Sequence, residues 1–301
     1  ISVVIPCFNH GEYILDAIAS VEASGEVNYE LIVINDGSTD VYTLGVLDKL
    51  RDRGYHVVDL ENQGLANARN HGIAIASGCY ILPLDSDNKI RPNYMRKGIA
   101  ILDESPEIGI VYGDVEFFGE TTGIWSLPDF DLYRLTIGNY IDACAVFRKQ
   151  VWQDCGGYDP DMPDKWGYED WDFWLSAAEK RWQFWHIPEV MFDYRTRSDS
   201  MVQTCKQPIN QKRLVHYICS KHIDLYTPRL ADVIADKEFV AFERMVELDS
   251  LRLELQRTKE EVERSRDREQ KTEENLQAIA DEVAHLKAMI EAMATSKFWQ
   301  L

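Results

Sequence analysis

Residues 80–88 read YILPLDSDN, an apolar segment that runs directly into two aspartates. A short, continuously apolar run that ends in polar turn residues is typical of a strand buried in a parallel sheet. Open parallel sheets bind ligands beyond the carboxyl ends of their strands. This stretch therefore predicts a parallel α/β sheet with a ligand site at Asp85 and Asp87.

The chain around this stretch alternates apolar runs with segments whose apolar residues recur at helical spacing. Such alternation builds a mostly parallel sheet with right-handed crossovers and flanking helices. Residues 119–145 are irregular and aromatic, and we assign no element there. The predicted elements are strands at 1–6, 31–34, 57–60, 80–84, 108–118 and 184–195, and helices at 11–23, 41–53, 64–76, 93–104, 147–155 and 169–181.

The C-terminal part of the chain has a different composition. From residue 236 to about residue 296 no Gly or Pro occurs, and charged residues dominate. A heptad repeat with its first a position at Leu248 has ten apolar residues at its fourteen a and d positions, and the four polar ones cluster at 258–272. This pattern predicts a long helix in a left-handed coiled coil with a weak centre. A single charged surface helix is the alternative.

We therefore divide the chain into a globular domain at 1–225, a helical connector at 226–245 and a coiled coil at 246–301. Self-association through the coiled coil would make the protein a homo-oligomer, with the number of strands left open. Because the chain begins on a strand without Met and stops at KFWQL, we expect a fragment of a longer protein.

Bulk composition restricts the location and the partners. Neither a signal peptide nor a run of eighteen apolar residues is visible, and the six cysteines form no CxxC pair. We expect reduced cysteines in a cytoplasmic protein, with a peripheral position at the inner face of the plasma membrane as an option. The net charge is −19, with 34 acidic and 20 basic residues in 1–225, which argues against nucleic acid as a partner.

Asp85 and Asp87 are the strongest candidates for chemistry. Two carboxylates at i and i+2 that leave a buried strand can reach one hard cation, Mg²⁺ or Mn²⁺, with phosphate oxygens completing its shell. A solvated turn is the alternative, and the same Asp-x-Asp pattern recurs at 129–131 and 159–161 without a preceding buried strand. A cation here would also explain how an acidic protein could bind an anionic ligand.

Two further residues have both a ligand-binding and a plain structural interpretation. Asp36 ends the second strand, where its carboxylate could accept hydrogen bonds from a nucleobase or a ribose, or could serve as a turn or helix-cap residue. Arg69 lies on the helix after Gly64, where it could contact diphosphate or form a surface ion pair.

Four ordered segments resemble family 2 glycosyltransferases, which have the GT-A fold, a Rossmann-like α/β architecture. The resemblance spans roughly residues 1–205 and leaves the coiled coil outside. The segments are SVVIPCFNHGEYILDAIASV (2–21), IVINDGSTD (32–40), NQGLANARNHGIAIASGCYILPLDSD (62–87), and GGYD (156–159) followed by YEDWDFWL (168–175).

The resemblance implies a metal-dependent, inverting hexosyltransferase with Mn²⁺ or Mg²⁺ as cofactor. The donor would be a nucleotide-diphosphate sugar, with a UDP-sugar favoured, and the acceptor a glycan, a lipid-linked glycan or a protein. Cell-envelope polysaccharide biosynthesis is one setting for such transfer. The residues that the resemblance implies for the nucleoside are Pro6, Phe8 and Asp36, and those that it implies for the rest of the donor site are Gly64, Asn67 and Arg69. The implied metal ligands are Asp85 and Asp87, and Asp85 would also contact the ribose. The implied catalytic base is Asp170 of the Glu169–Asp170 pair.

The chain departs from the family pattern at two places. Asn35–Asp36 stands where two aspartates are frequent, and Arg197 stands where many members have a His that helps to bind metal or diphosphate. A guanidinium cannot ligate a metal ion, but it can pair with diphosphate, so Arg197 is assigned to the donor.

Two other functions remain open from sequence. A nucleotidyltransferase also combines a parallel sheet, a nucleotide and Mg²⁺, but residues 6–13 lack the Lys or Arg expected of its phosphate loop. An inactive sugar-nucleotide-binding scaffold, oligomerised by the coiled coil, is the other. The acidic pairs at Asp85/Asp87 and Glu169/Asp170 favour an enzyme, because a scaffold does not need them.

Overall fold

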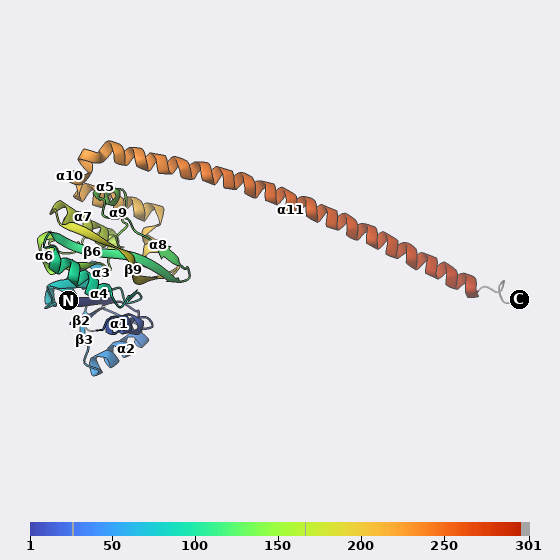
Figure 1. Cartoon of the computed structure of the whole chain (residues 1–301). Helices are drawn as coiled ribbons and strands as arrows, with labels where there is room; N and C mark the ends of the chain where they lie inside the picture. Colours follow the sequence, from blue (N-terminus) through green and yellow to red (C-terminus); the bar gives the residue numbers. More distant parts are fainter. Residues whose placement is uncertain (26, 166, 296–301) are drawn as a thin grey trace. The chain divides into compact units, whose positions relative to one another are not determined.

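The computed structural model describes residues 1–25, 27–165 and 167–295. The chain divides into two compact units, Ile1–Val233 and Ile234–Leu301 (Figure 1). In the described part of the chain, no helix is both long and apolar enough to cross a membrane. No disulfide joins the six cysteines, all of which lie among the described residues.

The first half of the sheet is parallel, as predicted. Its strands follow the order β3-β2-β1-β4, and β1, which lies between β2 and β4, is buried along its whole length, as a strand inside a parallel sheet is expected to be. The elements are β1 (Ser2–Cys7), α1 (Ile14–Glu22), β2 (Glu30–Asp36), α2 (Val41–Asp52), β3 (His56–Leu60), α3 (Leu65–Ile75) and β4 (Tyr80–Pro83).

The second half of the sheet is mixed. β6 (Ile108–Gly119) and β9 (Gln183–Thr196) are long parallel neighbours, whereas the short strands β5 (Lys89–Ile90), β7 (Gly123–Trp125) and β8 (Val146–Arg148) join antiparallel. β8 pairs with β4 and thereby connects the two halves. The α/β fold expected from sequence is confirmed.

Helices complete the first unit. The stretch left without assignment holds β7 and a short helix, α5 (Leu132–Ile137), whose first turn is capped by the Asp131 carboxylate. The other elements are α4 (Tyr94–Glu104), α6 (Lys149–Cys155), η1 (Pro163–Lys165), α7 (Glu169–Glu179), α8 (Met201–Cys205), α9 (Pro208–Lys221), α10 (Ile223–Tyr226) and η2 (Thr227–Arg229).

The second unit consists of one long helix. α11 runs from Leu230 to Thr295 over 66 residues, and it begins within the last residues of the first unit. The absence of Gly and Pro from the sequence of this region permits a helix of such length. The long C-terminal helix predicted from the sequence is confirmed.

A buried charge cluster ties α7 to the end of α9. His222 is 1% exposed, with Nε2 3.0 Å from Asp172 Oδ1 and Nδ1 3.0 Å from Glu179 Oε1. Lys221 Nζ lies 2.9 Å from the other oxygen of Asp172. Because α7 also carries Glu169 and Asp170, this cluster holds the helix on which the acidic pair stands.

This cluster predicts a pH-dependent contribution to stability. Burial disfavours the imidazolium, but the hydrogen bonds and charges of Asp172 and Glu179 outweigh it and raise the pKa of His222. A raised folded-state pKa stabilises the fold below the unfolded value of about 6.5, and this stabilisation is lost as pH rises through the folded-state value. We expect His222→Gln to lower the free energy of unfolding by about 1–3 kcal/mol near pH 6 and by less at alkaline pH.

Chemical unfolding of both proteins between about pH 6 and about pH 9 measures this difference. His216→Gln, at an exposed position of α9, is the matched control. Parallel pH profiles for wild type and His222→Gln would rule out the assigned charge interaction.

Candidate active site

Arg69 is the residue that gathers the candidate site. Its side chain is 1% exposed, with Nη2 2.6 Å from Asp85 Oδ1 and Nη1 paired with Glu169. The guanidinium also lies 5.6 Å from the centre of the Tyr158 ring. One buried cation therefore joins α3, the loop after β4 and the start of α7. The direct contact of Arg69 with diphosphate stays a prediction, since both ends of its fork are engaged within the protein.

Asp85 and Asp87 are close enough to influence each other. Burial and the negative charge of Asp85 raise the pKa of Asp87. Nε of Arg197 lies 3.5 Å from Asp87 Oδ2. Each aspartate thus has one arginine beside it. The pKa of Asp87 is nevertheless raised, because burial and the neighbouring charge of Asp85 outweigh the effect of Arg197.

These two aspartates suit a cation that is shared with a phosphorylated ligand. In residues 1–25, 27–165 and 167–295, no three His, Cys, Asp or Glu side chains are grouped to hold a metal ion. Mg²⁺ and Mn²⁺ at nucleotide sites commonly take only one or two carboxylates, with phosphate oxygens and water as further ligands. Burial is the larger cause of the raised pKa of Asp87, and a cation would offset the contribution that the charge of Asp85 adds to it. The donor set therefore fits such an ion.

His10 belongs to the site, although no sequence motif pointed to it. Its Nδ1 lies 2.9 Å from Ser86 Oγ, and its Nε2 lies 3.1 Å from Arg197 Nη2. Since a guanidinium only donates, Nε2 accepts, and Nδ1–H donates to Ser86. Burial lowers the pKa of His10, which is consistent with a neutral ring. Arg197 is further held over the Tyr13 ring, with 4.9 Å between guanidinium and ring centre.

Asp36 fixes the loop that leads into α3. Its Oδ1 accepts from the Gln63 amide at 2.9 Å, and its Oδ2 accepts from the Gly64 amide at 3.0 Å. Gly64 has φ of 92°, a backbone conformation that favours glycine. Asp40 rather than Asp36 caps α2, since its carboxylate accepts from the Thr43 amide. Binding of a nucleoside by Asp36 stays a prediction.

The other residues predicted for the donor lie near these loops. Pro6 is part of β1, and Phe8 follows the strand with 44% of its side chain exposed, as a ring that receives a nucleobase would be. Asn67 donates to the Gln63 carbonyl at 3.0 Å. Asn35 is buried, donates to Asp59 and accepts from the Ser38 amide, so this departure from the family pattern has a structural role that a carboxylate could not fill.

Asp170 is a half-buried carboxyl in the first turn of α7. Asn139 Nδ2 donates to its Oδ2 at 2.8 Å, and the Trp171 amide donates to its Oδ1. A helix N-terminus favours a carboxylate. Burial and the charges of Glu169 and Asp142 outweigh this effect and raise the pKa of Asp170 well above its ordinary value. A carboxyl tuned in this way is suited to accept a proton.

Asp142 is an acidic residue near Asp85 and Asp170 that was not predicted from the sequence. Burial, together with the charge of Asp85, raises the pKa of Asp142 to about 7. Its Oδ1 accepts from the Cys144 amide at 2.8 Å. Neither Asp142 nor Asn139 has a recognisable motif, because both lie in the irregular stretch between α5 and β8.

The tryptophans near Asp170 pack in the core. Trp171 and Trp174 are buried, and their indole N–H groups donate to the carbonyls of Leu135 and Ile141 at 2.7 and 2.9 Å. Both tryptophans are therefore side chains of the core. Trp166 lies outside the described residues.

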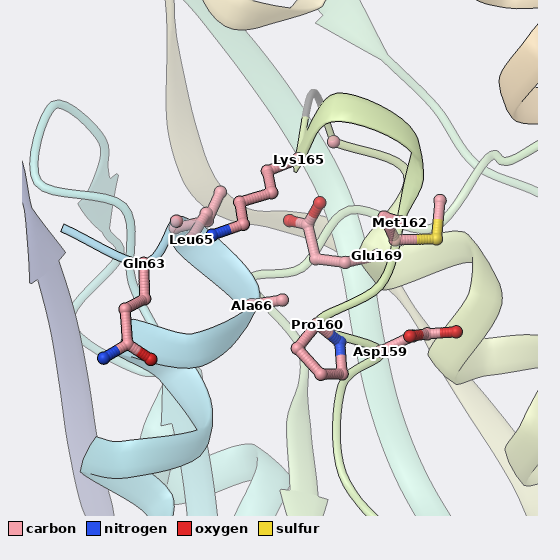
Figure 2. Close-up of a pocket in the computed structure, with 10 residues that line it drawn as sticks. Gln63, Leu65, Ala66, Asp159, Pro160, Met162, Lys165 and Glu169 are labelled. Carbon is pink, nitrogen blue, oxygen red and sulfur yellow. The ribbon is translucent and has the colours of Figure 1, made fainter.

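A pocket opens beside Glu169, between the start of α3 and the segment before α7. In Figure 2, Lys165 reaches toward Leu65, with Glu169 beside it. Lys165 also covers Gly64, where an added Cβ would come within 3.0 Å of the lysine side chain. The lining residues are Gln63, Gly64, Leu65, Ala66, Asp159, Pro160, Met162, Lys165, Gly167 and Glu169.

Several known proteins are similar to this chain. The family model described as Glycosyl transferase family 2 matches residues 2–156. Poly-beta-1,6-N-acetyl-D-glucosamine synthase of Staphylococcus epidermidis is 31% identical over 54% of this chain and 42% of its own length. The uncharacterized protein y4gI of Sinorhizobium fredii is 30% identical over 66% of this chain and 23% of its own length. The chain thus spans less than half of either relative.

A relative of similar length and a solved structure are similar to a larger part of this chain. The uncharacterized glycosyltransferase YwdF of Bacillus subtilis is 26% identical over 74% of this chain and 84% of its own. The crystal structure of S. aureus TarS 1-349 in complex with UDP-GlcNAc has a TM-score of 0.57 at 18% identity, over 75% of this chain and 72% of that one. This likeness supports the fold.

Proposed function

Because the chain belongs to glycosyl transferase family 2, we propose that it transfers a hexose-type sugar from a nucleotide-diphosphate donor to a hydroxyl group. The acceptor would be a glycan, a lipid-linked glycan or a protein. The observation that carries the proposal is the buried Arg69, which brings Asp85 and the Glu169–Asp170 pair to one site. A UDP-sugar is favoured, because the solved neighbour of this fold was crystallised with UDP-GlcNAc.

The side chains suggest a single displacement with inversion. As the acceptor oxygen forms its bond to the anomeric carbon, the bond from that carbon to the diphosphate oxygen breaks. Asp170 would take the hydroxyl proton, since its raised pKa favours proton capture. Arg197, oriented by His10 and Tyr13, would pair with the departing diphosphate.

The acidity of the site is the reason to include a divalent cation. The carboxylates of Asp85, Asp87, Asp142, Glu169 and Asp170 outnumber the guanidinium groups of Arg69 and Arg197. An anionic donor would therefore be repelled by the site on its own. Mn²⁺ or Mg²⁺ bound by Asp85 and Asp87 would neutralise the diphosphate as negative charge develops on it.

This role for the cation predicts a specific loss. We expect chelation of divalent ions, and separately Asp87→Asn, to lower donor turnover on the order of 100-fold. Isothermal titration of the donor with and without Mn²⁺ would show that the ion-dependent part of binding is gone in the variant. Asp52→Asn, at an exposed position of α2, is the control. Full activity of Asp87→Asn in chelator would remove the metal from the proposal.

A panel of nucleotide sugars tests the function itself. The expected result is thermal stabilisation by one nucleotide sugar, with release of its nucleotide diphosphate when an acceptor is present. Binding without turnover under any condition would favour the inactive scaffold. Formation of pyrophosphate from a nucleoside triphosphate and a sugar phosphate would instead indicate a nucleotidyltransferase.

A further inference from the structure

α11 presents a row of exposed apolar side chains. The ten apolar a and d residues between Leu248 and Met293 have 44–65% of their side chains exposed. An apolar stripe of this kind on a long helix, interrupted only by the polar residues at 258–272, indicates a missing helical partner. The ten residues are Leu248, Leu251, Leu255, Val262, Leu276, Ile279, Val283, Leu286, Ile290 and Met293.

The charges that flank this row are complementary to those of a second copy. In a parallel pair in register, each g residue faces the e residue five positions later on the other strand. Five of the seven such pairs join opposite charges, two pairs contain no charge, and none joins like charges. The charged pairs are Glu247–Arg252, Glu254–Lys259, Glu261–Arg266, Arg268–Glu273 and Glu282–Lys287.

An antiparallel pair would lose this complementarity. It brings g residues opposite g residues and e residues opposite e residues. Four of the five charged g residues are Glu, whereas four of the five charged e residues are Lys or Arg. Most contacts between charged side chains would therefore join like charges.

In the pair Arg268–Glu273 the basic residue stands at g and the acidic residue at e, opposite to the other four charged pairs. This reversal favours the in-register pair over pairs shifted by one heptad. If one strand slips by a heptad, Glu261 faces Glu273 on one side of the pair and Arg268 faces Arg266 on the other. Each side then keeps two attractive pairs in place of five and gains one repulsive pair. Glu269, an acidic residue at an a position, lies next to Arg268 and would meet that compensating charge on the partner strand. A polar residue at an a position is a known device for setting register.

We propose that α11 pairs with α11 of a second copy of this chain as a parallel, in-register, two-stranded coiled coil from Leu248 to Met293. Two strands are favoured because ten of the fourteen e and g residues are charged, and these positions become more buried in larger bundles. The proposal does not depend on the proposed sugar transfer.

Exchanging the charges of g and e residues tests three parts of the proposal at once: that the partner is a second copy of the chain, that the strands are parallel and that they are in register. One full-length variant carries Glu254→Lys and Glu261→Lys, and a second carries Lys259→Glu and Arg266→Glu. Alone, each is expected to dissociate roughly tenfold to a hundredfold more readily than wild type at low ionic strength, because its interstrand pairs become repulsive. Mixed together, they should form heterodimers with wild-type affinity, since every altered pair is again attractive.

Sedimentation equilibrium measures these affinities, with a wild-type mass of twice 34.7 kDa expected. The control variant carries Glu260→Lys and Glu274→Lys, the same charge change at outer f positions, and should stay dimeric. Leu255→Cys in a Cys79→Ser background should form an interchain disulfide, because residue 255 meets its own copy only in the parallel register. Monomeric or trimeric wild type, homodimers unaffected by the exchange, or absence of that disulfide would overturn the proposal.

Discussion

Replacing Asp170 by Asn is expected to lower sugar transfer about 10²–10⁴-fold while donor affinity changes less than about twofold. The amide keeps the shape of the side chain, and its single oxygen can accept from Asn139 or from the Trp171 amide but not from both. It cannot take a proton from the acceptor hydroxyl. Single-turnover transfer and donor titration, performed in parallel, separate these two effects. Asp161→Asn, at an exposed position of the segment before α7, is the matched control.

The pH dependence should identify the same group. Since the pKa of Asp170 is raised, the basic form is lost as pH falls through that value, and wild-type transfer should decline on the acid side. The pKa of Asp142 is also raised, to about 7, so Asp142→Asn must be measured beside it. If Asp142→Asn abolished transfer and Asp170→Asn retained it, the base would be Asp142.

Arg69→Met is expected to destabilise the fold by about 3–5 kcal/mol, the largest stability effect we predict. Removal of this guanidinium leaves Glu169 buried and Asp85 partly buried without their shared counter-charge. Denaturant unfolding measures the loss. Arg69→Lys keeps the charge but not the fork that reaches two carboxylates, so an intermediate value is expected.

A second-site change shows whether the loss is electrostatic. Glu169→Gln should recover part of the stability in the Arg69→Met background, because one of the two uncompensated charges is gone. A loss below about 1 kcal/mol in Arg69→Met, or no recovery in the double variant, would contradict the assigned role. Ala74→Met, at an exposed position of the same helix, controls for introduction of a methionine.

Much of the site could be located from local patterns alone. Asp85 and Asp87 follow a buried strand, Asp36 ends another, and Glu169–Asp170 begins a predicted helix, so their places at element ends were readable in advance. His10, Asn139 and Asp142 were missed because each lies in a loop and carries no local periodicity. Their relevance depends on which distant residues they meet.

By itself, the sequence determined the order of the longer strands and helices up to α7 and β9, the family resemblance and the heptad with its flanking charges, but not the short elements β5, β7, β8 and α5. These properties depend on short motifs and on periodicities of two to seven residues, so they can be read from neighbouring residues in the sequence. Only the tertiary structure decided that Arg69 binds Glu169 across 100 positions and that His10 meets Arg197 across 187. Such contacts arise from packing of the whole unit, which buries Arg69 between two carboxylates of the protein itself.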